Sequence, residues 1–161
     1  MIQFLKNIVL SLAALLAAIS VHAEGVTYTP IPVTNAPTSG TSLTNAIPAA
    51  MIYSNPVLIS VSDFSDVGIS LTGYKGLGDG SNCTVILRRS WNNGVTYENT
   101  GSITWTVPLL ANLNTNSYGT NIIVGSASAL QLFTITNGST NGGLGTLNLT
   151  DFGYILKDHH N

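Results

Sequence analysis

Apolar and polar residues alternate along most of this chain, and that period of two restricts the fold to β-structure. Val67, Ile69 and Leu71 alternate with small or polar residues, and the apolar residues of 103–109 do the same. Each stretch therefore has one apolar and one polar face, which is the pattern of a half-buried strand. After residue 23, no stretch shows the spacing of an amphipathic helix.

Six further segments have strand composition, and clusters of Gly, Asn and Ser typical of turns separate them. They are 56–62, 83–89, 95–99, 118–124, 129–137 and 146–157. About eight short strands at this spacing predict an all-β fold, an antiparallel two-sheet β-sandwich that is jelly-roll-like. A closed barrel is the less favoured arrangement.

The last of these segments contains a break in phase. Leu147 and Leu149 share one face of a regular strand, whereas Phe152 and the apolar residues after it lie on the other. One extra residue at Thr150 or Asp151 would return both sets to the same face. The sequence therefore predicts a β-bulge at this point.

Residues 1–23 have the three parts of a secretory signal peptide. Lys6 is followed by an apolar run over 8–19 and by small residues at 21–23, so a mature chain would start at Glu24. The run is shorter than the roughly 20 residues that span a bilayer. We expect a secreted, periplasmic or surface protein with no membrane span in its mature chain. The alternative is a hydrophobic arm retained in an assembled particle.

Residues 24–50 are rich in Pro, Thr, Ser and Asn. Prolines at positions 30, 32, 37 and 48 predict an extended arm with at most one edge strand near 26–28. Such an arm would cover an edge of its own sheet or reach a second subunit. Residues 51–158 are expected to form the β-sandwich domain, and 159–161 a disordered tail.

The chain has 5 Lys and Arg against 7 Asp and Glu. This small negative excess gives no attraction to nucleic acid or anionic lipid, so we expect no nucleic-acid partner. Charged residues make up only 7% of the chain, so Asn, Thr, Ser and Gly must make its surface polar. A neutral polar surface suits subunits of assemblies, and a homo-oligomer or a particle surface is the expected partner.

Cys83 is the only cysteine, which excludes an intramolecular disulfide. It begins the apolar segment 83–87, so a buried, unreactive thiol is expected. Arg88 and Arg89 are adjacent in a predicted strand and must face opposite sides. The inward-facing arginine needs a carboxylate partner, for which Glu98 is the candidate.

Residues 90–97, Ser-Trp-Asn-Asn-Gly-Val-Thr-Tyr, resemble the Asp-box, a hairpin of sialidase propellers and other secreted β-proteins. Ser90, Gly94 and Tyr97 match its pattern, whereas Asn92 stands where the box prefers Asp. An Asn side chain also accepts hydrogen bonds from turn N–H groups, and Gly94 permits a positive φ. The box is structural in its family, so the resemblance implies a hairpin and no sialidase activity.

The order of segments from about 56 to 157 resembles small β-sandwich proteins of phage structural regions. The resemblance rests on V-x-I-S-L-T-G-Y at 67–74, V-I-L-R-R-S at 85–90, T-W-T-V-P-L at 104–109 and N-L-T-x-x-x-Y-x-L-K at 148–157. Such proteins decorate virion heads or form parts of tails and fibres. The resemblance implies a virion decoration or tail protein with a retained hydrophobic N-terminus.

Few side chains are available for chemistry. Apart from His22, the histidines lie at 159–160, so no imidazole within the fold can activate a Ser or Cys83. A glycosidase would need two convergent carboxylates, and the folded candidates are Asp63, Asp66, Asp79, Glu98 and Asp151. We expect no enzymatic activity and no cofactor.

Metal binding is not expected either. The Gly-rich segment 78–82 could offer oxygen ligands to calcium together with Asp63 or Asp66, which leaves one open alternative. A turn without a metal is the favoured reading of that segment. The histidines at 159–160 lie at a chain end, where ligand geometry is poor.

Three aromatic residues beside predicted loops are candidates for ligand binding: Trp91, Tyr74 and Tyr118. Exposed rings can stack on sugars while Asn side chains bond their hydroxyls. The same rings could instead cap the ends of a sandwich. Trp105 alternates with apolar neighbours and is expected in the core.

These features favour a non-enzymatic, exported structural or surface protein that self-assembles or docks on a cell surface or virion. A carbohydrate-binding module that uses exposed aromatics is the alternative from a different class, with a glycan as its partner.

Overall fold

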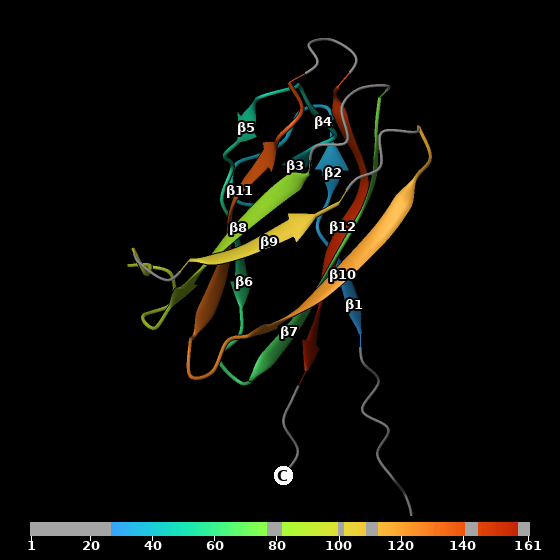
Figure 1. Cartoon of the computed structure of the whole chain (residues 1–161). Helices are drawn as coiled ribbons and strands as arrows, with labels where there is room; N and C mark the ends of the chain where they lie inside the picture. Colours follow the sequence, from blue (N-terminus) through green and yellow to red (C-terminus); the bar gives the residue numbers. More distant parts are fainter. Residues whose placement is uncertain (1–26, 77–81, 100–101, 109–112, 141–144, 158–161) are drawn as a thin grey trace, which may run out of the picture.

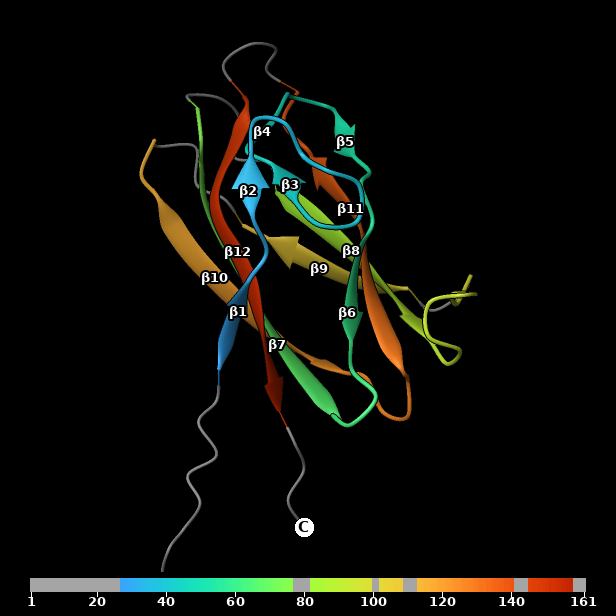
Figure 2. The same cartoon turned by 180° about the vertical axis from the view of Figure 1, so that it is seen from behind.

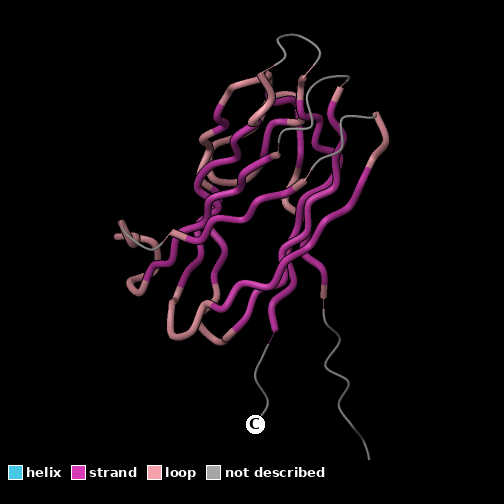
Figure 3. The backbone as a smooth tube through the Cα atoms, viewed as in Figure 1, coloured by secondary structure: helices cyan, strands magenta, loops and turns pink. Residues whose placement is uncertain are grey.

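The computed structural model describes residues 27–76, 82–99, 102–108, 113–140 and 145–157. Within these ranges the chain consists of strands and loops, with no helix (Figure 3). The strands are β1 (Tyr28–Pro30), β2 (Val33–Thr34), β3 (Leu43–Thr44), β4 (Ala46–Ile47), β5 (Ile52–Tyr53), β6 (Val57–Ser60), β7 (Asp66–Lys75), β8 (Cys83–Ser90), β9 (Ile103–Val107), β10 (Asn116–Ile123), β11 (Ala129–Asn137) and β12 (Leu147–Lys157). The expected signal peptide at 1–23 and tail at 159–161 lie outside the described residues.

Two five-stranded antiparallel sheets pack against each other (Figure 1). Sheet I has the order β1-β12-β7-β10, and β4 also pairs with β12. Sheet II has the order β5-β11-β8-β9, and β6 also pairs with β11. β2 and β3 form a separate parallel pair. The predicted all-β, antiparallel two-sheet sandwich is confirmed, and the additional strands are short ones within 28–53.

Alternation along each strand places the core between the sheets. In β7, Val67, Ile69 and Leu71 are at most 2% exposed, while the residues between them are half-buried on the outer face. Trp105 of β9 is half-buried and packs against the same core, as expected. Burial of such side chains is the main source of stability for a chain with no internal disulfide.

β12 contains the predicted β-bulge at its break in phase. β12 pairs with β7 over its whole length, and the register shifts between Leu149 and Asp151. Leu149 before the shift and Phe152 after it are both buried in the core. The β-bulge therefore keeps both apolar sets of this strand on the inner face.

The proline-rich segment is part of the sandwich. β1 and β4 pair with β12, and Ile31, Leu43 and Ile47 are buried in the common core. Figure 2 shows β2 and β3 between β12 on one side and β11 on the other, so the segment covers the open side of the sandwich. The segment thus covers an edge of its own sheet, which is one of the two alternatives expected for it.

No strand forms at 95–99, so that prediction is wrong. β8 pairs with β9, and Glu98 N donates one backbone hydrogen bond to Arg89 O (3.0 Å). Side chains hold the loop instead: Gly94 N donates to Ser90 Oγ (2.9 Å) and Thr96 N donates to Asn92 Oδ1 (2.9 Å). These bonds satisfy backbone donors that a ladder would otherwise use. Gly94 has the positive φ expected of it, 83°.

Cys83 is fully buried, and burial raises the pKa of its thiol to about 12, although the nearby Lys75 charge opposes the rise. The thiolate is the reactive form, so at pH 8 it is about a thousandfold scarcer than in a thiol of ordinary pKa near 9.0. We expect Cys83 to resist thiol reagents in the folded protein and to react fully in denaturant, as measured with Ellman's reagent. Rapid labelling of the folded chain would contradict this placement.

Candidate functional site

The outer face of sheet I lacks side chains at three positions on neighbouring strands. Gly153 of β12 is in register with Ser70 of β7, which is in register with Gly119 of β10. In the next row, Gly68 of β7 lies between Ile155 and Asn121. Gly68 and Gly119 contribute no side chains, so the sheet surface is lowered at these two positions, whereas the Tyr28 ring covers Gly153.

A groove of about 420 Å³ lies at this place. We call it the sheet I groove, and it is lined by Gly68, Ile69, Ser70, Gly119, Thr120, Asn121, Ile155 and Lys157. These residues come from three adjacent strands, so the groove extends across the strands to β10, the edge strand. Its surface is mainly apolar, with few polar groups, which is the usual composition of small-molecule sites.

Tyr28 of β1 places an aromatic ring beside the groove. A side chain at Gly153 would meet the Tyr28 ring at 2.3 Å, so the ring lies directly on that glycine. The Tyr28 hydroxyl donates to Asp151 Oδ2 (2.5 Å), and the residue is 39% exposed. Burial raises the pKa of this hydroxyl, the hydrogen bond to Asp151 raises it further, and a hydrogen bond with Ser70 opposes them. The phenol therefore stays neutral at physiological pH.

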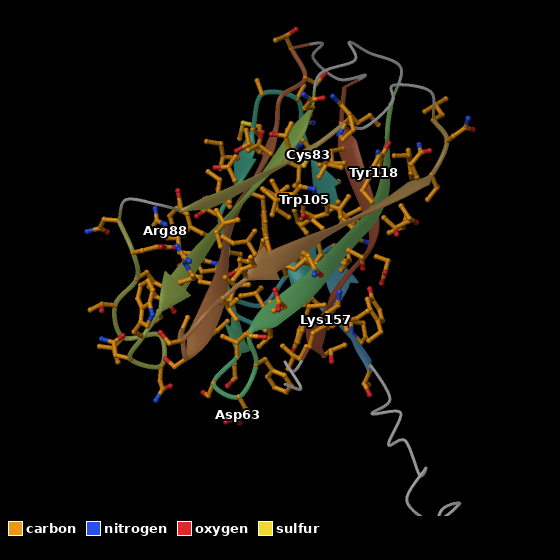
Figure 4. All side chains as sticks on the ribbon, turned by 60° about the horizontal axis from the view of Figure 1, so that its bottom comes forward. Asp63, Cys83, Arg88, Trp105, Tyr118 and Lys157 are labelled. Atoms are coloured by element: carbon orange, nitrogen blue, oxygen red, sulfur yellow. The ribbon has the colours of Figure 1, made fainter. Side chains whose placement is uncertain are left out.

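Polar pairs border the groove on two sides. On one side, Lys157 Nζ donates to Asn121 Oδ1 (2.7 Å), which joins β12 to β10 across Gly68. On the other side, the hydroxyls of Thr72 and Ser117 are 2.9 Å apart. Figure 4 shows Lys157 on this sheet. The groove thus has an ammonium, an amide and hydroxyls along its rims.

Trp91, one of the three aromatic residues predicted to bind a ligand, lies in the loop after β8 and is 55% exposed. The Arg89 guanidinium carbon is 5.7 Å from the centre of its ring, a cation–π contact. That loop projects from the left side of Figure 1 at the end of sheet II, whereas the groove lies on sheet I. Trp91 is therefore not part of the groove.

Tyr74 and Tyr118 also lie apart from each other. Tyr74 is on the outer face of sheet I, in register with Asn148 and four residues beyond Ser70 along β7. Tyr118 packs against the core, and its hydroxyl donates to Pro108 O (2.8 Å). The three predicted aromatics therefore do not converge on one site.

The two arginines of β8 occupy opposite faces, as expected. Arg89 forms the predicted ion pair with Glu98, with Nη2 3.0 Å from Oε2, and Glu98 Oε1 also accepts from Arg89 N. Arg88 stacks on Phe133, with its guanidinium carbon 3.4 Å from the ring centre. Both arginines are therefore engaged within sheet II or beside it.

The described residues contain no group of three or more His, Cys, Asp or Glu that could hold a metal ion. Most of the alternative calcium segment, residues 78–81, lies outside the described ranges, as does Asp79. Two described carboxylates lie on the outer face of sheet I: Asp66 at the start of β7, and Asp151 level with Thr72. Asp66 and Thr72 are six residues apart on β7, so the backbone positions of the two carboxylates are about 20 Å apart along the strand.

Sequence reasoning missed the groove and Tyr28. The available signal was the set of small residues at outward positions of β7, namely Gly68, Ser70 and Thr72, together with Gly119 and Gly153 in other strands. A glycine in a strand indicates a close approach or a gap. Which glycines lie side by side depends on strand order, and that order is not written locally in the sequence.

No family model matches the chain, and no curated protein matches it. Three solved structures are similar to it at 12% identity: a xylan-binding module CBM15 (TM-score 0.46, covering 84% of this chain and 100% of that chain), a Family 16 Carbohydrate Binding Module-2 (0.43, 79% and 86%) and the CBM22-1 xylan-binding domain from Paenibacillus barcinonensis Xyn10C (0.40, 83% and 95%). All three TM-scores are below 0.5, so the function proposed below rests on the residues of this chain alone.

Among the described residues, no helix is long and apolar enough to span a membrane.

Proposed function

We propose that this protein is an exported, non-catalytic carbohydrate-binding protein and that the sheet I groove holds its glycan. The observation that carries the proposal is the Tyr28 ring lying on Gly153 beside a groove with hydrogen-bonding groups along its rims.

Sugars present two kinds of surface, a face of C–H groups and a rim of hydroxyls. The exposed part of the Tyr28 ring offers the flat apolar surface that a C–H face requires. The hydrogen bond to Asp151 and the contact with Gly153 hold the ring in place before a ligand arrives. A ring held in this way loses little conformational entropy on binding.

The rims supply hydrogen-bonding groups of both kinds. Lys157 and the Asn121 amide donate, and the hydroxyls of Ser70, Thr72 and Ser117 both donate and accept. Sugar hydroxyls also donate and accept, so they can bond to either rim. The apolar floor between the rims limits the number of buried polar groups that must find partners.

Three carboxylates of the described chain, Asp66, Asp151 and Glu98, are not arranged as a pair for glycoside hydrolysis. Hydrolysis requires two carboxyl groups roughly 5 to 9.5 Å apart. Asp66 and Asp151 occupy levels about 20 Å apart on sheet I, and Glu98 is paired with Arg89 beside sheet II. This arrangement supports binding without catalysis.

Filling the groove is the direct test. Gly119 has an ordinary φ, and a Cβ there would touch only Ile69 O at 3.5 Å, so Gly119→Gln can fold without strain. We expect this variant to bind a glycan selected on a polysaccharide array at least about tenfold more weakly than the unaltered chain, or about 1.4 kcal/mol. Isothermal titration calorimetry measures the change, and thermal unfolding checks that the fold is retained.

Thr104→Gln is the matched control, because Thr104 is exposed on the outer face of sheet II and the new side chain is the same. It is expected to bind like the unaltered chain. Loss of binding in Trp91→Ala but not in Gly119→Gln would move the site away from the groove. An array with no glycan signal would refute the proposed function.

A further inference from the structure

We infer that the free edge of β10 pairs with β10 of a second copy of this chain, so that two sheet I grooves join end to end. The extension of the groove rests on the proposed function, whereas the edge pairing stands on the strand itself. Four observations on β10 and its surroundings support the inference.

β10 pairs on one side only within the described residues. It forms eight continuous pairs with β7, from Asn116 to Ile123, with no register shift. Its other side has no partner strand, because β10 ends the order of sheet I. An unbulged edge of this length presents a row of backbone donors and acceptors suited to another strand.

The other sheet edges in the described chain are short or bounded by proline. β1 has three residues and ends at Pro30, β6 has four and follows Pro56, and β9 has five and precedes Pro108. β4 and β5 have two residues each. Shortness and proline are common means of preventing edge pairing. β10 has neither.

The sequence of β10 suits pairing with itself. In an antiparallel pair related by a two-fold axis, the residue at the axis faces its own copy and residues equally distant from the axis face each other, so charges of one sign at these positions would repel. β10 reads Asn-Ser-Tyr-Gly-Thr-Asn-Ile-Ile and contains no charged residue. Ile123 at its end is 72% exposed, which leaves apolar area for a partner to cover.

The position of the groove indicates which residues of the two β10 strands lie opposite each other. Residues directly opposite in an antiparallel pair point to the same side of the sheet, so pairing Gly119 with Gly119 of the second copy keeps one continuous outer face. The groove residues Ser70 and Gly119, which lie side by side, then continue into the same two residues of the second copy in reverse order. Two grooves that each open at β10 become one groove of twice the length.

Cross-linking at the two-fold axis tests the pairing. With the full chain, we expect size-exclusion chromatography with light scattering to show a dimer, and Gly119→Cys to give a covalent dimer with a short bis-maleimide. Thr104→Cys is the control, since Thr104 is equally exposed on β9, an edge strand of the other sheet. Buried Cys83 is not expected to contribute.

A charge at the axis provides the second measurement. Gly119→Lys places two ammonium groups across the pair and is expected to weaken dimerisation by about fivefold. Gly119→Gln has a similar length without the charge, and it is expected to remain dimeric while losing glycan binding. The two variants therefore separate failure of the pairing from failure of the proposed function.

Two results would overturn the inference. One is a chain that stays monomeric at high micromolar concentration. The other is a dimer that Gly119→Cys does not cross-link and Gly119→Lys does not weaken, because that dimer would use another surface. A dimer linked at Gly119 in a chain that binds no glycan would support the pairing and refute the carbohydrate-binding proposal.

Discussion

Deletion of Ser70 is expected to abolish the folded state of this protein, whereas deletion of Thr150 is expected to leave it folded. Thr150 is the extra residue at the register shift between Leu149 and Asp151, so without it β12 becomes a regular strand that still has Leu149 and Phe152 on the inner face. β7 has no extra residue in its pairing with β10, and without Ser70 the buried Leu71 would turn to the outer face. Exposure of a buried Leu alone costs about 2 to 5 kcal/mol, and the whole fold of a small domain has only about 5 to 15 kcal/mol to lose.

The measurement is far-UV circular dichroism with thermal unfolding. Deletion of Thr150 is the matched control, because it also removes one residue but takes away only the extra residue of the bulge and the hydroxyl that donates to Thr72 O (3.2 Å). The control is expected to unfold cooperatively at a somewhat lower temperature than the unaltered chain. If both deletions abolished the folded state, the bulge would not be the place where β12 accommodates its extra residue.

Replacement of Arg89 is expected to lower the free energy of unfolding by about 3 kcal/mol. The Glu98 side chain is only 7% exposed, and Arg89 supplies its guanidinium donors through Nε and Nη2. Arg89→Met leaves the carboxylate with its backbone bond from Arg89 N but without a compensating charge. A buried carboxylate without a counter-charge is costly, whereas removing both partners is often tolerated.

Urea unfolding of a double-mutant cycle measures this coupling. Arg89→Met combined with Glu98→Leu is expected to be more stable than Arg89→Met alone. Arg88→Met is the control, since the neighbouring arginine lies on the opposite face over Phe133 and pairs with no carboxylate in the described chain. If the two substitutions at Arg89 and Glu98 lowered stability additively, the ion pair would not contribute as described.

The part of the fold that depends on local order was predictable. The period of two located β7 and β9, and strand composition between turn clusters located β6, β8, β10, β11 and β12. The phase break in β12 located its bulge, because side-chain direction alternates strictly along a strand. The Arg89–Glu98 pair was predictable for the same reason. An inward-facing arginine requires a carboxylate, and Glu98 follows closely enough to return to it.

The one strand that was wrongly predicted also has a local cause. The segment 95–99 has strand composition, but the side chains of Ser90 and Asn92 bind the backbone of the loop and remove its donors from any β-ladder. For the segment 24–50, the prolines predict an extended arm and leave open whether it covers its own sheet or a second subunit. Only its contact with β12 shows that Ile31, Leu43 and Ile47 complete the core.

The sequence by itself determined that this protein is a neutral, all-β sandwich with one buried thiol and a bulge in its last strand, because each of these follows from neighbours in the chain. The groove and the free edge of β10 were decided only by the tertiary structure. Gly68 and Gly119 are far apart in sequence, and they lower one surface only because β7 and β10 are neighbours in sheet I. Strand order is set by non-local packing. A glycine in a strand can therefore be assigned to a groove only when the residues beside it on the neighbouring strands are known.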